Sequence, residues 1–242
     1  MADQGWSNVP GAGAVRPAGV AFDAGLRQHM LGIYRNMGLA LLVSAAVAWI
    51  VASTPAIYQP IFGTPLKWVA IFAPLAFVLF FSFRFEKMTL SGARTALFAF
   101  AALMGISLAS VLLVFTGASI ATTFLVAAVT FLSMSLWGYT TRADLTRFGS
   151  FLFMGLIGVV LASVINLFLQ SGVLQLVVSI IGVVVFTGLT AWDTQRAKAD
   201  YIAYGASQQA EKLAVMSALS LYLNFVNLFQ LLLQFTGVQR EG

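Results

Sequence analysis

Seven long apolar stretches without internal charge dominate this chain of 242 residues. Each is close to the roughly 20 residues that an α-helix needs to cross the hydrocarbon core of a bilayer. Transmembrane β-strands are only about 10 residues long and alternate in polarity, which these continuous stretches do not do. The sequence therefore predicts an all-α membrane protein, a bundle of seven transmembrane helices. The predicted helices occupy residues 37–57, 68–84, 95–115, 118–139, 149–170, 173–193 and 213–235.

The composition agrees with a membrane protein and excludes several other classes. Only 9% of the residues are charged and 60% are hydrophobic, whereas soluble domains carry roughly 25% charged residues. So little charge cannot cover the surface of a soluble enzyme. The chain also has no cysteine, which excludes disulfides, zinc thiolate sites and a cysteine nucleophile.

The basic residues gather on one side of the predicted membrane. Eleven of the thirteen lie in segments on the side of the amino terminus, and two lie on the other side. This bias predicts a cytoplasmic amino terminus and a carboxyl terminus outside. It also explains the net charge of +5 without a nucleic-acid partner. The eleven are Arg16, Arg27, Arg35, Arg84, Lys87, Arg94, Arg142, Arg147, Arg196, Lys198 and Lys212, and the two are Lys67 and Arg240.

The chain divides into a tail and one membrane domain. Residues 1–21 are rich in Gly, Ala and Pro and predict a disordered cytoplasmic tail, and residues 22–242 form the membrane domain. Residues 22–34 predict a short amphipathic segment along the cytoplasmic surface before the first span. Very short connections near Gly117 and Ser171 predict two helical hairpins, the third span with the fourth and the fifth with the sixth.

Few groups for catalysis are available. The only histidine, His29, precedes the first predicted span, so no imidazole is expected inside the bundle for proteolysis or zinc-dependent hydrolysis. A retinal pigment needs a lysine in the middle of the last helix, but Lys212 lies at its entrance. We therefore expect no enzyme and no cofactor.

Asp193 is a candidate functional residue because polar groups inside a membrane are costly. It follows the sixth apolar stretch, in the run G-L-T-A-W-D-T-Q-R, and is expected at or just below the cytoplasmic interface. The alternative is an ordinary solvated charge at the end of a helix.

The last span carries a stripe of polar side chains. Ser217, Ser220, Asn224 and Asn227 follow one another at spacings of three, four and three, and they fall within about 80° of one another on a helix. Tyr222 lies on the opposite side. Such a stripe cannot face lipid, so this helix is predicted to lie inside the bundle. The alternative role is adhesion between helices.

Arg84 lies at the cytoplasmic end of the second span, in F-S-F-R-F-E-K. It serves either as an ordinary positive-inside anchor or as an ionic latch for Asp193, since both are predicted in the same leaflet. Counting from Leu213 places Asn224 about 16 Å into the last span, deeper than Asp193, unless that helix begins earlier, between Ser207 and Lys212.

Two motifs resemble the transmembrane Bax inhibitor motif family in its bacterial form. They are A-W-D-T-Q at residues 191–195 and A-L-S-L-Y-L-N-F-V-N-L-F-Q-L-L-L at residues 218–233, and the segment G-L-R-Q-H-M-L-G-I-Y before the first span is also similar. The resemblance implies a bundle in which six helices surround the last one. It also implies a multi-pass protein of the bacterial inner membrane.

Some members of this family look like pH-sensitive calcium leak channels. The resemblance implies a sensor made of two aspartates, one in each motif, and an arginine of the second span that latches onto the pair. In this chain the positions are Asp193, Asn224 and, on a weaker match, Arg84. Asn224 departs from the pattern, and because two carboxylates at one site titrate as a coupled pair, an amide there is expected to alter the pH response.

Two functions follow as hypotheses. The first is a leak of calcium or other cations, in which Asp193 is the gate or a transient calcium contact and Asn224 is its partner. The alternative is a non-conducting stress regulator or scaffold that binds a membrane protease or another membrane protein. The polar segment from Thr194 to Lys212, predicted as a long loop, is its candidate docking surface.

Overall fold

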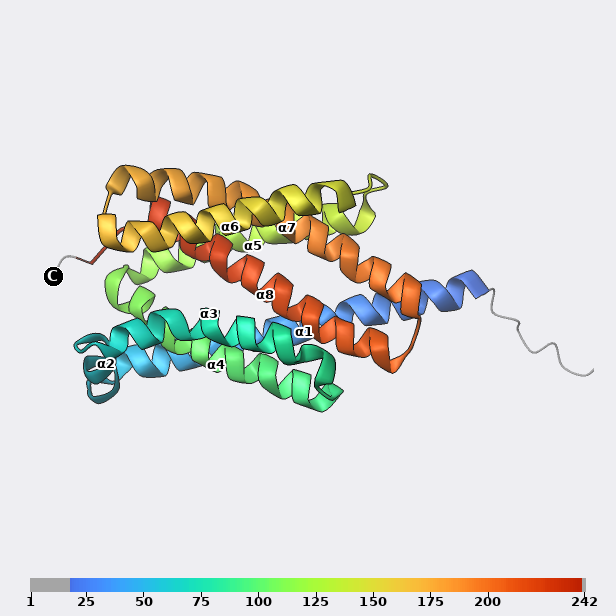
Figure 1. Cartoon of the computed structure of the whole chain (residues 1–242), viewed down its shortest axis with the longest axis horizontal. Helices are drawn as coiled ribbons and strands as arrows, with labels where there is room; N and C mark the ends of the chain where they lie inside the picture. Colours follow the sequence, from blue (N-terminus) through green and yellow to red (C-terminus); the bar gives the residue numbers. More distant parts are fainter. Residues whose placement is uncertain (1–17, 241–242) are drawn as a thin grey trace, which may run out of the picture.

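The computed structural model describes residues 18–240, and within this range the chain is helical and contains no strand. Seven of its helices are long and apolar enough to cross a membrane, α2 and the 3₁₀ turn η1 being the exceptions. The predicted all-α class and the seven spans are therefore confirmed (Figure 1). The helices are α1 (Ala18–Ser53), α2 (Pro55–Phe62), α3 (Leu66–Arg84), η1 (Phe85–Lys87), α4 (Leu90–Val114), α5 (Gly117–Thr140), α6 (Thr146–Leu169), α7 (Gly172–Tyr204) and α8 (Gln208–Thr236).

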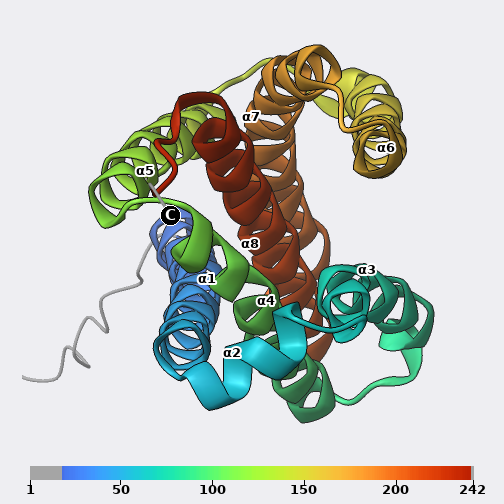
Figure 2. The same ribbon diagram turned by 90° about the vertical axis from the view of Figure 1, so that its left-hand side faces the viewer.

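The last helix, α8, is the centre of the bundle, as predicted. It packs against α7, α1, α5 and α4. In its most apolar window 61% of the residues are buried, whereas no other span exceeds 33%. Figure 1 shows α8 crossing obliquely between α5, α6 and α7 on one side and α1, α3 and α4 on the other. Figure 2 shows α3 and α6 at the periphery.

The first helix corrects one prediction. Residues 22–34 do not form a separate surface segment, because α1 runs without a break from Ala18 to Ser53. Leu26, Met30 and Ile33 are buried in the core, which ties this first part of α1 to the bundle. The predicted tail, residues 1–21, falls mostly on residues 1–17, which lie outside the described part of the chain.

Two connections also differ from the prediction. The short helix α2 follows the first span, where Pro55 starts a new helix at its first position. The hairpin of α6 and α7 is confirmed, since the two pack along each other. The predicted hairpin of α4 and α5 is wrong: α4 packs mainly on α1, and α5 mainly on α7 and α8. A short connection fixes where two helices meet but leaves their crossing angle free.

The segment from Thr194 to Lys212 is helical over most of its length, so the predicted long loop is wrong. α7 continues to Tyr204, and the connection to α8 is only Gly205 to Ser207. The reason is local: T-Q-R-A-K-A-D-Y-I-A-Y contains good helix formers and no Gly or Pro. Ala197 and Tyr201 are buried on its inner side.

The α3–α4, α5–α6 and α7–α8 connections lie together at one end of the bundle, which we call the basic end (Figure 1). The carboxyl terminus lies at the opposite end. Arg84, Arg94, Arg142, Arg147 and Lys212 all lie in or beside these three connections. The placement of the basic end in the cytoplasm follows from the charge bias and stays a prediction.

Candidate functional site

Asp193 and Asn224 meet where α7 crosses the central helix. The Asn224 side chain donates a hydrogen bond from Nδ2 to Oδ2 of Asp193, with 2.7 Å between the two atoms. Both residues are buried, with exposed fractions of 8% and 4%. The alternative of a solvated helix-end charge is therefore wrong for Asp193. The carboxylate is joined to the innermost helix of the bundle.

The depth mismatch between the two residues shrinks from about 16 Å to about 7 Å because both helices are longer than predicted. α7 runs 11 residues beyond Asp193, to Tyr204, and α8 begins at Gln208 rather than at Leu213. α7 ends and α8 begins close to the same level, on either side of a three-residue turn. Asp193 and Asn224 face each other a few turns into this antiparallel pair.

The motif A-W-D-T-Q, which contains Asp193, contacts several neighbouring helices at once. Ala191 lies so close to Gly138 of α5 that a Cβ atom there would come within 2.3 Å of the Ala191 carbonyl oxygen. Trp192 covers Gly149 of α6, where a Cβ atom would lie 2.5 Å from the indole nitrogen. These two glycines are required for close approach. The motif thus fixes α7 against α5 and α6 on either side of the carboxylate.

Thr194 continues this set of contacts through a chain of hydroxyl groups. Its Oγ1 lies 2.9 Å from Oγ of Ser135 on α5, and that oxygen lies 2.6 Å from the Tyr34 hydroxyl on α1. The sequence analysis did not predict this series of hydroxyl groups. The available signal was weak: a serine within the apolar stretch of residues 118–139 has to find a partner inside the membrane.

Gln195, the last residue of the motif, holds the α5–α6 connection. Its Oε1 accepts a hydrogen bond from the Leu145 backbone N–H, and its Nε2 donates one to the Ala143 carbonyl, both at 2.8 Å. Asp144 lies in the same connection, outside the spans. Hydrogen bonds from Thr146 hold the pKa of Asp144 below its ordinary value, so this carboxylate is ionised at neutral pH.

Replacing Gln195 with alanine is expected to loosen the α5–α6 connection. The variant loses two hydrogen bonds and leaves two backbone groups of residues 143–145 without their partner, which costs about 2 kcal/mol locally. Hydrogen–deuterium exchange of residues 141–146 would accelerate, whereas Gln209→Ala, at an exposed position of α8, would leave it unchanged. Equal exchange in both variants would contradict the role given to Gln195.

Arg84 does not reach Asp193 in this structure. It is exposed at the end of α3, a helix that packs on α4 rather than on α7 or α8. Among the side chains of residues 24–240, the only ion pair joins Arg94 of α4 to Glu211 of α8, with 3.9 Å between nitrogen and oxygen. The latch stays a prediction. The 3₁₀ turn η1, directly after Arg84, does contact α8, because Nζ of Lys212 donates a hydrogen bond to the Glu86 carbonyl at 2.7 Å.

The polar stripe of α8 lies inside the bundle and is only partly covered. Ser217 and Asn224 are buried, whereas Ser220 and Asn227 are half-buried. Asn227 donates a hydrogen bond to its own helix, to the Leu223 carbonyl at 2.8 Å. Six of the eight half-buried positions of α8 repeat every three or four residues, so they form one line beside the face that contacts α7. They are Leu213, Met216, Ser220, Leu223, Asn227 and Gln230.

The opposite side of α8 is anchored by Tyr222, as the spacing predicts. Its hydroxyl lies 2.6 Å from Oγ of Ser44 on α1, and Ser44 donates a hydrogen bond to the Ala101 carbonyl of α4 at 2.7 Å. The ring meets Phe100 edge to face. Tyr222 is fully buried, and its contacts hold α8 against α1 and α4.

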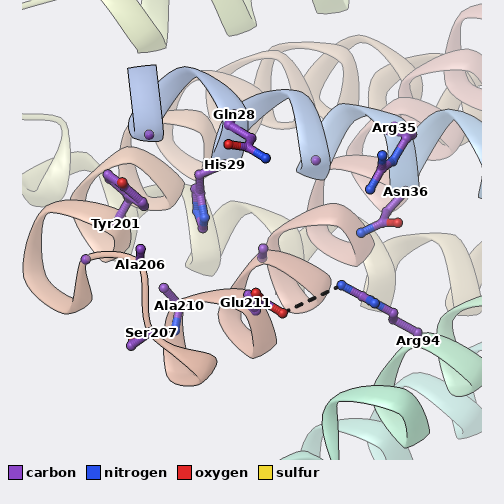
Figure 3. A pocket seen from close by; sticks show the side chains of 14 residues that line it. Gln28, His29, Arg35, Asn36, Arg94, Tyr201, Ala206, Ser207, Ala210 and Glu211 are labelled. Atoms are coloured by element: carbon purple, nitrogen blue, oxygen red, sulfur yellow. Dashed lines mark hydrogen bonds and ion pairs between the residues drawn. The ribbon is translucent and has the colours of Figure 1, made fainter. Parts of the chain in front are cut away.

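A polar cavity of about 340 Å³ opens at the basic end (Figure 3). Gln28, His29, Arg35 and Asn36 reach it from α1, and Arg94 and Glu211 approach from α4 and α8. The His29 ring lies against Tyr201, with 5.1 Å between ring centroids. Further residues at its wall and floor are small: Gly25, Gly32, Ala206, Ala210 and Ala214.

This cavity ends before it reaches Asn224. Ala214 belongs to its lining. Beyond Ala214 along α8, the side chains of Ala218, Leu221 and Tyr222 are completely buried. The cavity, which we call the vestibule, therefore does not extend to Asn224 in this structure.

The donor set around Asp193 does not make a permanent metal site. The described side chains, those of residues 24–240, contain no group of three or more His, Asp or Glu. Asp193 and Asn224 supply one carboxylate and one amide, whereas calcium takes six to eight oxygen ligands. These two residues alone therefore do not complete a calcium site.

Comparison with known proteins gives a consistent result. A family model described as "Inhibitor of apoptosis-promoting Bax1" matches residues 26–241. The uncharacterized protein RP147 of Rickettsia prowazekii is 45% identical over 220 residues, which cover 91% of this chain and 93% of that protein. An uncharacterized protein of Caulobacter vibrioides is 44% identical over 234 residues, covering 93% and 94%. The inner membrane protein YbhL of Escherichia coli K12 is 43% identical over 221 residues, covering 90% and 94%.

Proposed function

The chain belongs to the Bax inhibitor family, and on this basis we propose that it is a cation leak protein of the bacterial inner membrane, with calcium as the transported ion. The relative YbhL is an inner membrane protein, and the seven spans of this chain suit the same location. We further propose that the basic end faces the cytoplasm, because eleven of thirteen basic residues are predicted on that side.

The contact between Asp193 and Asn224 is the observation that carries this proposal. It joins α7 to the central helix by a hydrogen bond to a buried charged group, a kind of bond that contributes about 1.5–3 kcal/mol. The vestibule opens from the basic end, and the polar stripe of α8 continues beyond it. In our proposal the contact keeps the path shut, and a cation passes Asp193 when α7 separates from α8.

We propose no enzymatic role. The only histidine lies in the vestibule and not among the buried polar residues near Asp193. The alternative, a regulator that binds a membrane protease, relied on an exposed polar loop from Thr194 to Lys212. That segment is mostly helix packed against α8, so we prefer the leak.

Calcium influx into proteoliposomes that contain an internal calcium dye tests the proposal. Wild type is expected to conduct above protein-free vesicles. Asp193→Ala and Asn224→Ala, which both remove the contact, are expected to raise influx about tenfold, as the loss of one such hydrogen bond allows. Asp144→Asn, an exposed acid at the same end of the bundle, is the matched control and should behave as wild type.

Equal influx in wild type, Asp193→Ala and Asn224→Ala would contradict the gate. Wild-type influx no higher than that of protein-free vesicles would contradict conduction itself. The non-conducting regulator would then be the better explanation, and capture of a membrane protease by the full chain would support it.

A further inference from the structure

A groove of about 640 Å³ separates α1 from α5 near the basic end. Leu31 forms part of the α1 wall, and Leu132 and Leu136 form part of the α5 wall. All three leucines are exposed, with no protein covering them. Because both helices cross the membrane, this groove opens toward lipid.

The groove exists because α1 and α5 are joined at one level and stay apart between that level and the basic end. The Tyr34 hydroxyl and Oγ of Ser135 form the bond between them, 2.6 Å apart. From Tyr34, α1 continues seven residues to Arg27, which places Arg27 about 10 Å nearer the basic end. Apart from these three residues and Tyr139, the lining side chains are apolar: Met30, Leu31, Leu132 and Leu136.

The mouth of the groove is basic. Arg27 is exposed there and belongs to the lining. Lys198 of α7 does not line the groove itself but contacts its lining residue Tyr139: its Nζ lies 5.1 Å from the centre of the Tyr139 ring and donates a hydrogen bond to the Tyr139 carbonyl. The eight lining residues include no acidic side chain. A groove with apolar walls and a basic, aromatic rim matches the two parts of a phospholipid.

We propose that this groove binds an anionic phospholipid of the leaflet at the basic end. One acyl chain lies between Leu31 and Leu136, and the phosphate lies between Arg27 and Lys198. The charges distinguish this ligand from a zwitterionic lipid, whose amine would face two cations, and from a second copy of this chain, which would bring basic rim to basic rim. The proposal does not depend on whether the protein conducts ions.

Native mass spectrometry of the full chain, released from detergent with equimolar dioleoyl-phosphatidylglycerol and dioleoyl-phosphatidylcholine, tests this site. Wild type is expected to retain phosphatidylglycerol preferentially. Arg27→Gln should bind it about fivefold more weakly, the effect of one basic residue near a lipid phosphate. Leu136→Trp, which fills the groove, should abolish the preference. Arg147→Gln is the matched control, since Arg147 lies on the peripheral helix α6 and does not line the groove.

Three outcomes would overturn the proposal. Binding by Arg27→Gln that equals wild type would contradict the phosphate contact. An equal loss in Arg147→Gln would show that overall surface charge, and not this groove, selects the lipid. A dimer that retains no lipid and is broken by Leu136→Trp would assign the groove to a second copy. Folding of each variant is checked by its thermal transition in the same detergent.

Discussion

Replacing Asn224 with aspartate is expected to make the stability of the protein fall as the pH rises from about 5 to 8. Two carboxylates at hydrogen-bond distance cannot both ionise easily, so the native pair holds one proton between them. The unfolded chain releases that proton at neutral pH. Native protein then binds one more proton than unfolded protein, and the free energy of unfolding decreases by about 1.4 kcal/mol per pH unit. Thermal unfolding in detergent at a series of pH values measures this slope.

The same substitution three residues along α8 provides the control. Asn227 is half-buried and bonds to its own helix rather than to Asp193, so Asn227→Asp should show a much smaller slope. A similar slope in both variants would contradict a specific contact between residues 193 and 224.

In the flux assay, Asn224→Asp is also expected to open as the pH rises, because the second charge repels Asp193 once the shared proton is lost.

The second large effect is expected at Gly138. Its α5 backbone lies against Ala191, and the Cβ atom of Gly138→Ala would come within 2.3 Å of a carbonyl oxygen. A backbone atom cannot move aside as a flexible side chain does, so α5 and α7 have to separate. We expect a loss of about 3 kcal/mol or more, at the upper end of overpacked cores, and a lower thermal transition in detergent.

Gly158→Ala is the matched control for this prediction. Gly158 lies in α6, and no atom lies within 4 Å of the position where its Cβ would be. Alanine there should stabilise the helix by about 0.5–1 kcal/mol. If Gly138→Ala were as stable as Gly158→Ala, the close approach of Ala191 to α5 would be wrong.

The sequence was sufficient for the spans and for the central helix. Long apolar stretches predict spanning helices because the bilayer allows few alternatives. The spacing of Ser217, Ser220 and Asn224 predicted a buried α8 because a polar stripe cannot face lipid. The contact of Asp193 with Asn224 was implied by family resemblance, whereas counting residues from Leu213 argued against it.

Other features could not be predicted from local pattern. The predicted end of the sixth span, residue 193, is too early because a run of charged residues after an apolar stretch indicates a loop. In the structure Arg196 and Lys198 belong to α7, whose inner side is apolar. The bonds of Ser135 and Gln195 depend on which helices become neighbours. The proposed latch at Arg84 has the same difficulty: a position in the right leaflet does not determine which neighbour α3 packs against.

The central position of α8 has a consequence for biogenesis. A ribosome completes the other six spans before α8 emerges, and α8 is the least apolar of the seven spans, with a mean hydropathy of 1.5. The six earlier spans therefore have to leave the central position free until α8 inserts. Chains that terminate before Gln208 would expose the unfilled interior and become substrates for membrane quality control.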